Sequence, residues 1–166
     1  MGIAALLYGV ATAAGIQSHP QRYAVSSKSE APPVVFVCEH GSVKSLIAAS
    51  YFNRRAQAKG LSVRAIARGV TPEPTVPLPV RNGLYAAGFD VSGYIPQLLE
   101  ASDISGATLV VSFDEDISDA VEGRTRYLKW DNLPAVLSDY ARGKDAIVKQ
   151  VDRLMYELAG GRHHER

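Results

Sequence analysis

The sequence contains a single cysteine and carries almost no net charge. One cysteine among 166 residues cannot form an internal disulfide, and it cannot build a zinc site from several cysteines. The 18 Lys and Arg residues nearly balance the 17 Asp and Glu residues, which leaves a formal charge of +1. This balance provides no bulk attraction to nucleic acid or to acidic membranes. We therefore expect no nucleic-acid partner. We also expect no metal and no other cofactor.

The apolar run at residues 2–16 is too short to span a bilayer comfortably, so we expect no stable membrane span. It has the length of the apolar core of a secretory signal, and Ala11-Thr12-Ala13 resembles a cleavage site. This makes residues 1–16 a candidate signal peptide and predicts a periplasmic or secreted protein. No lysine or arginine precedes the run, so a leader on a cytoplasmic protein is the alternative.

Composition divides the rest of the chain into a linker, a domain and a tail. Residues 17–32 are polar and rich in proline and serine, which predicts a linker. Residues 33–159 have the length and the apolar content of one folded domain with its own core. Residues 160–166 form a polar tail.

Strand patterns alternate with helical patterns along the domain. Apolar or alternating segments predict strands at 34–37, 61–67, 107–113 and 124–130. Helical spacing and glycine terminators predict helices at 43–59, 78–87, 97–101, 115–122 and 142–158. This alternation implies an α/β fold, in which helices cover both faces of a parallel sheet. Ligands bind such sheets at the carboxyl ends of the strands.

The only cysteine, Cys38, lies where a buried strand ends and a short polar loop leads into a helix. The unpaired N–H groups and the dipole of a helix start favour a thiolate and an oxyanion. A cation such as Lys44 can neutralise a bound oxyanion, and the neighbouring hydroxyl of Ser45 can donate to the thiolate. The candidate oxyanion-binding residues are Glu39, His40, Gly41, Ser42, Val43, Lys44 and Ser45.

Simpler interpretations exist for each of these residues. A cysteine is often buried as a small hydrophobic residue, and Lys44 can be an ordinary solvated lysine. We expect His40 to shape the rim of the pocket rather than act as a base. Tyr94 can line the same rim, although core packing is the default for an aromatic residue. The acidic residues 114–116 are expected to cap a helix.

Cys38 to Ser45 resembles the Cys-x5-Arg-Ser signature of low-molecular-weight protein tyrosine phosphatases and of the arsenate reductases that share their fold. The resemblance continues through residues 76–94, 109–114 and 130–140, and it covers about residues 33–159. It implies a low-molecular-weight phosphatase-like domain with three α/β/α layers and a four-stranded parallel sheet. It also implies catalysis through a cysteinyl-phosphate intermediate.

The signature residues match the family unevenly. Cys38 corresponds to the nucleophile, and Ser45 corresponds to the loop serine. Lys44 occupies the arginine position, which keeps the charge but loses the two-pronged hydrogen bond. Gly41 stands where the family usually has asparagine. His40 resembles a variant found in some of the arsenate reductases.

The general acid is the weakest part of the match. The family places an aspartate directly before a proline, whereas here Leu133 precedes Pro134. The nearest carboxylate is Asp131, which makes Asp131 the candidate acid. Its simpler role is to cap the turn that follows.

Three functions remain open at this stage. The first is a hydrolase that removes phosphate from a phosphorylated small molecule or a phosphoprotein, phosphotyrosine included, through Cys38. The second is an arsenate reductase in which an external thiol regenerates Cys38. The thioredoxin-coupled type of the family resembles a relay of three cysteines, and this chain has only one, so that type is excluded. The third is an inactive family member that only binds an oxyanion.

Overall fold

The computed structural model describes residues 31–123 and 125–160. The candidate signal peptide at 1–16, nearly all of the predicted linker and the tail beyond residue 160 lie outside the described residues. Among the helices of the described part, none is long and apolar enough to cross a membrane.

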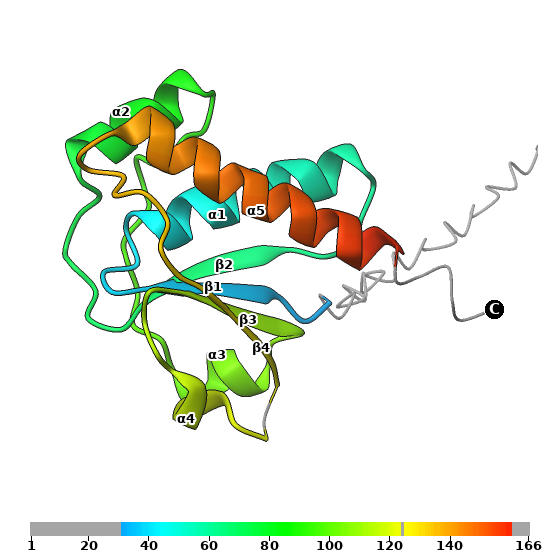
Figure 1. Cartoon of the computed structure of the whole chain (residues 1–166). Helices are drawn as coiled ribbons and strands as arrows, with labels where there is room; N and C mark the ends of the chain where they lie inside the picture. Colours follow the sequence, from blue (N-terminus) through cyan, green and yellow to red (C-terminus); the bar gives the residue numbers. More distant parts are fainter. Residues whose placement is uncertain (1–30, 124, 161–166) are drawn as a thin grey trace, which may run out of the picture.

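Four parallel strands form the centre of the molecule (Figure 1). They are β1 (Val34–Cys38), β2 (Ala65–Gly69), β3 (Leu109–Phe113) and β4 (Arg126–Trp130). Their order across the sheet is β2-β1-β3-β4, and every neighbouring pair is parallel. All residues of β1 and β3 are buried, as expected for central strands that are covered on both faces. The predicted four-stranded parallel sheet is confirmed.

Helices cover both faces of the sheet, which confirms the predicted three layers. They are α1 (Lys44–Ala58), α2 (Leu78–Ala86), α3 (Ala101–Ser105), α4 (Ser118–Val121) and α5 (Tyr140–Gly160). In Figure 1, α1, α2 and α5 lie above the sheet, and α3 and α4 lie below it. Alternate residues of β1 enter the two cores. Phe36 belongs to the core with Ile147 of α5, whereas Val35 belongs to the core with Ile104 of α3.

The helix predicted at 97–101 is wrong. This segment is extended and lies beside the end of β2, where Gly69 N donates to Gln97 O at 2.8 Å and Leu99 N donates to Gly69 O at 2.9 Å. β2 is an edge strand, and the unpaired backbone groups of an edge need partners. The helix of this region, α3, begins only at Ala101.

Other elements differ from prediction in length. β2 begins at Ala65 rather than at residue 61, and α5 begins two residues earlier than predicted. The acidic segment 115–122 is helical only over Ser118–Val121. The Asp116 carboxylate accepts hydrogen bonds from the backbone N–H and the hydroxyl of Ser118, at 3.1 and 2.7 Å, which forms a local turn before the helix, but the N-cap residue is Ile117 and no side chain caps α4.

The strand order determines where the loops meet. β1 is central, so its last residue, Cys38, lies between the carboxyl ends of β2 and β3. The loops that follow β1, β3 and β4 therefore converge at one edge of the sheet, the edge at which parallel α/β sheets bind ligands.

Candidate active site at the carboxyl end of the sheet

Cys38 is the last residue of β1, and its side chain is buried with 6% exposure. Its sulfur lies 3.0 Å from the hydroxyl oxygen of Ser45, which is fully buried in the first turn of α1. A hydroxyl at this distance can donate to a thiolate. The structure thus brings together the two residues that the sequence singled out as nucleophile and thiolate partner.

The loop after Cys38 is tied down through its carbonyl groups. Four successive carbonyl oxygens accept hydrogen bonds from outside the loop: Cys38 O from Val70 N (3.1 Å), Glu39 O from Thr71 N (2.7 Å), His40 O from Glu73 N (3.4 Å) and Gly41 O from the Tyr94 hydroxyl (2.7 Å). A peptide plane points its N–H opposite to its carbonyl. The N–H groups of residues 39–42 therefore face the inside of the loop.

Among the described residues, these inward N–H groups have no acceptor. Within residues 31–123 and 125–160, the backbone N–H groups of residues 40–46 donate to no protein acceptor. They comprise the inner face of the loop and the first turn of α1, where a helix leaves its N–H groups unpaired. This arrangement is suited to an anion with several oxygens.

Gly41 allows the loop to lie against the end of β2. Its φ is +69°, and a Cβ at this position would lie 2.8 Å from the backbone nitrogen of Gly69. A Cβ on Gly69 would in turn lie 2.8 Å from the nitrogen of Gly41. Two glycines are therefore needed where these segments touch, since real Cβ atoms do not approach backbone so closely.

Two side chains of the loop reinforce this attachment. The Ser42 hydroxyl donates to the Glu73 carboxylate. The Nδ1 atom of His40 lies 3.1 Å from the carbonyl oxygen of Thr71. That hydrogen bond, together with the nearby carboxylates of Glu39 and Glu73, raises the pKa of His40 above its usual value. His40 thus sits on the rim of the pocket, in a negative environment.

Tyr94 has a structural task that sequence reasoning missed. Its hydroxyl donates to Gly41 O, so the side chain holds the loop, and Tyr94 is not among the residues that line the pocket. Burial, reinforced by the nearby Cys38, raises the pKa of Tyr94 to about 12. The hydroxyl therefore stays protonated and able to donate over the working range of the protein. No local signal in the sequence links Tyr94 to a loop 53 residues away.

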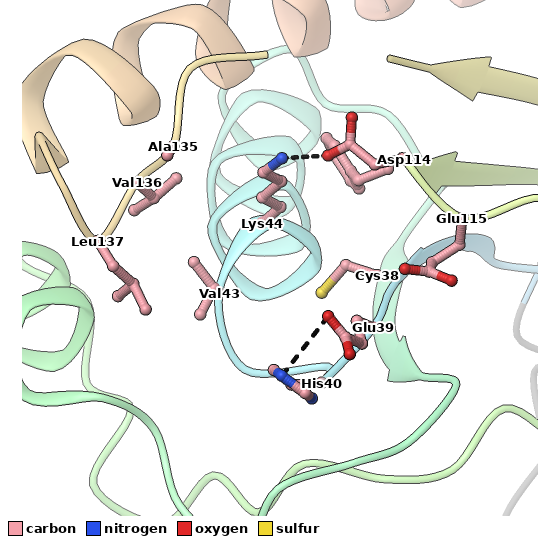
Figure 2. Close-up of a pocket in the computed structure, with 11 residues that line it drawn as sticks. Cys38, Glu39, His40, Val43, Lys44, Asp114, Glu115, Ala135, Val136 and Leu137 are labelled. Carbon is pink, nitrogen blue, oxygen red and sulfur yellow. Dashed lines mark hydrogen bonds and ion pairs between the residues drawn. The ribbon is translucent and has the colours of Figure 1, made fainter. Parts of the chain in front are cut away.

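Lys44 is the first residue of α1, and its ammonium group donates to the carboxylate of Asp114. Asp114 follows β3 directly, with a φ of +60°, and its other carboxylate oxygen accepts from Asn132 N at 3.2 Å. Figure 2 shows Lys44 directed toward Asp114 rather than toward the sulfur of Cys38. The expected role of Asp114 as a helix cap is wrong, because it holds the candidate cation of the site.

Cys38 opens into a pocket of about 270 Å³. Eleven residues line it: Cys38, Glu39, His40, Val43, Lys44, Phe113, Asp114, Glu115, Ala135, Val136 and Leu137. The apolar residues 135–137 from the loop between β4 and α5 form one side, and the carboxylates of Glu39 and Glu115 lie on the opposite side (Figure 2). In the described part of the chain, no cluster of three or more His, Cys, Asp or Glu residues is arranged to hold a metal ion.

The pocket unites only part of the predicted site. Glu39, His40, Val43 and Lys44 line it beside Cys38, whereas Gly41, Ser42 and Ser45 support it from behind. Asp131 is not among the lining residues, and its carboxylate lies 3.5 Å from the ammonium of Lys129. Asp131, Asn132 and Leu133 thus lead up to the wall of the pocket without placing a carboxylate on it.

Comparison with solved structures finds the same fold in phosphatases and arsenate reductases. A low molecular weight protein tyrosine phosphatase from T. tengcongensis is 21% identical, with a TM-score of 0.66, over 75% of this chain and 98% of that chain. An arsenate reductase from Archaeoglobus fulgidus is 25% identical, with a TM-score of 0.58, over 73% of this chain and 97% of that chain.

A third structure is longer than the region it shares with this protein. The thioredoxin-dependent arsenate reductase Cg_ArsC1' from Corynebacterium glutamicum is 20% identical, with a TM-score of 0.67 over 81% of this chain. The match spans 65% of the length of that reductase. A search of curated protein sequences gives no significant match.

The sequence profile of one protein family matches most of the chain. The profile is described as low molecular weight phosphotyrosine protein phosphatase, and it matches residues 33–150. The matched region includes all four strands and the loop from Cys38 to Ser45. This chain belongs to the low molecular weight phosphotyrosine protein phosphatase family.

Proposed function

We propose that the protein is a phosphatase that hydrolyses phosphate monoesters through a covalent intermediate on Cys38. One observation carries the proposal. The Cys38 sulfur lies 3.0 Å from the Ser45 hydroxyl at the base of a loop whose N–H groups, over residues 40–46 of the described chain, have no protein acceptor. A bound phosphoryl group supplies the oxygens that those donors lack.

The reaction has two steps, each of which transfers the phosphoryl group. In the first, the Cys38 thiolate attacks phosphorus, an S–P bond forms and the ester P–O bond breaks. The leaving oxygen takes its electron pair and gains a proton from water. In the second, water attacks the cysteinyl phosphate, the S–P bond breaks, and inorganic phosphate and the thiolate are released. The loop N–H groups stabilise the charge on the transferring oxygens in both steps.

The apolar wall favours an aryl phosphate as substrate. Val136 and Leu137 stand across the pocket from the acidic side, and they contribute no proton donor. Phenolate is a much better leaving group than an aliphatic alkoxide, so an aryl ester depends least on a general acid. The sequence candidate for that acid, Asp131, does not line the pocket, and its carboxylate lies 3.5 Å from the ammonium of Lys129. We therefore propose phosphotyrosine as the preferred ester.

Lys44 must donate to the phosphoryl group while its ammonium is also paired with the carboxylate of Asp114. A single ammonium offers its donors from one point, whereas a guanidinium can donate to a carboxylate and to a phosphate at once. The present pairing thus lowers the charge available to the substrate. This predicts a slow enzyme rather than an inactive one.

Hydrolysis of p-nitrophenyl phosphate by the full chain tests the proposal. We expect release of nitrophenol by the wild-type protein and none by Cys38→Ser. Lys44→Arg should raise kcat/KM by about tenfold, because the guanidinium restores the second hydrogen bond. Lys149→Arg, on the exposed surface of α5, is the matched control and should leave the rate unchanged. Wild-type release no higher than that of Cys38→Ser would overturn the proposal.

A second candidate is arsenate reduction, favoured by the similarity to two solved arsenate reductases. In this reaction the Cys38 thiolate would form an S–As bond with arsenate as water is lost from arsenic. One external thiol would then attack the Cys38 sulfur, so that the S–As bond breaks, its electron pair reduces arsenic to arsenite, and Cys38 is left in a mixed disulfide. A second external thiol would release the Cys38 thiolate, and the two external thiols would leave joined as a disulfide. The single cysteine of this sequence makes the external thiol necessary. Arsenate-dependent oxidation of added glutathione, absent in Cys38→Ser, tests it. If neither reaction occurs but phosphate protects Cys38 from alkylation, the protein only binds the oxyanion.

A further inference from the structure

The pocket around Cys38 carries more negative than positive charge. Its lining includes the carboxylates of Glu39, Asp114 and Glu115 but only one lysine, Lys44. Lys44 is already paired with Asp114. In the part of the chain that the structure describes, no lysine or arginine pairs with Glu39 or Glu115. Two carboxylates therefore face the pocket without a permanent positive partner among the described residues.

His40 offsets this charge only in part. Its Nε2 atom lies 3.6 Å from the carboxylate of Glu39, and its side chain is 44% exposed. The hydrogen bond to the Thr71 carbonyl is the main reason that the pKa of His40 is raised, and Glu39 and Glu115 add to it. Both carboxylates thus act on the same region of the rim. Even with His40 protonated, the charge of Glu115 is not matched.

This negative charge weakens the binding of a phosphate ester whose organic part carries no positive charge. A phosphate dianion in the loop meets the unpaired N–H groups of residues 40–46 on one side and two carboxylates near the mouth of the pocket (Figure 2). Repulsion between the phosphate and these two carboxylates raises the free energy of the complex. A positive group on the organic part of the substrate would reverse the sign of that interaction at Glu39 and Glu115.

We propose that Glu39 and Glu115 select phosphate esters whose organic part is positively charged, namely phosphotyrosine flanked by lysine or arginine in a peptide. The inference rests on the proposed phosphatase function of the same site. The aryl ring packs on Val136 and Leu137, which leaves the flanking residues of the peptide to reach the acidic side. The loop N–H groups bind the phosphoryl group, and the two glutamates determine which peptide carries it.

Binding of peptides to the Cys38→Ser variant of the full chain tests this preference without turnover. Three phosphotyrosine peptides of equal length carry lysine, glutamine or glutamate on both sides of the phosphotyrosine. We expect the lysine peptide to bind about tenfold more tightly than the glutamate peptide at low salt, with glutamine between them. The difference should nearly vanish at about 1 M salt, where the Debye length falls to ~3 Å.

Charge-removing variants assign the preference to the two residues. Glu39→Gln with Glu115→Gln, made in the Cys38→Ser background, should reduce the ratio between the lysine and glutamate peptides to about twofold or less. The matched control is Glu122→Gln with Glu157→Gln, which removes the same two charges from exposed residues, at the end of α4 and on α5, that do not line the pocket. It should leave the ratio near that of the parent.

The outcomes separate this inference from the phosphatase proposal. Equal binding of the three peptides, or the same ratio after both glutamates are changed, overturns the charge selection even if p-nitrophenyl phosphate is hydrolysed. Failure of all three peptides to bind overturns it as well. Preferential binding of the lysine peptide, with no hydrolysis by the wild-type protein, supports the charge selection and contradicts the phosphatase.

Discussion

Replacement of Gly41 by alanine tests the close approach that shapes the active-site loop. The new Cβ carries two costs. Alanine at a φ of +69° pays about 1–2 kcal/mol for the left-handed conformation. The Cβ would also lie 2.8 Å from the backbone nitrogen of Gly69, and relief of such overpacking costs about 1–3 kcal/mol. We therefore expect Gly41→Ala to lower the free energy of unfolding by about 2–5 kcal/mol.

Gly60 provides a control that separates the two costs. It has a similar φ of +61°, and a Cβ there would meet no atom within 4 Å. Gly60→Ala should therefore lose only about 1–2 kcal/mol. The smaller entropy of the unfolded alanine chain affects both variants equally and cancels in the comparison. The difference between the variants isolates the contact between the loop and β2.

Urea unfolding of the full chain, followed by circular dichroism, measures both variants. For a domain of this size, each kcal/mol also lowers Tm by about 3–5 °C. Gly41→Ala should in addition lose the protection that phosphate gives Cys38 against alkylation, because the inward N–H groups shift with the loop. Equal destabilisation of Gly41→Ala and Gly60→Ala, within about 0.5 kcal/mol, would refute the reasoning.

Three further substitutions probe single contacts of the site. Asp114→Asn should tighten phosphate binding, measured by calorimetry, by about threefold to tenfold, because the charge of Lys44 is no longer neutralised. Unchanged affinity would mean that the ion pair with Asp114 does not compete with the substrate for Lys44. Tyr94→Phe leaves Gly41 O without its donor and should lower the free energy of unfolding in urea by about 1–2 kcal/mol. It should also lower kcat/KM by a larger factor than it changes KM. A variant that loses stability alone would show that Tyr94 has no part in the reaction. Asp131→Asn should lower kcat for an aryl phosphate by less than about tenfold, whereas a loss of ~10²–10⁴ would identify Asp131 as the general acid after all.

Local pattern was sufficient to predict the architecture. The run of apolar residues before Cys38 specifies a strand buried on both faces, and the helical spacing after residue 43 specifies the helix that follows. Both signals depend on neighbouring residues only, which is why the existence of the four strands, of the three layers and of the loop after Cys38 was predicted, although the bounds of β2 and β4 were not. The helix predicted at 97–101 was wrong, because this segment is extended along the edge of β2, which is distant in the sequence.

The tertiary structure alone decided how the site is charged and how its loop is held. Lys44 and Asp114 are 70 residues apart, and Gly41 and Tyr94 are 53 apart, so no local pattern links them. The sequence determined that a thiol would stand at a helix start with a hydroxyl and a cation beside it. Only packing of β1 between β2 and β3 set that cation against Asp114, closed the loop with Tyr94 and placed apolar residues rather than Asp131 on the pocket wall. The physical reason is that pairing and burial depend on distances across the fold, which local periodicity does not encode.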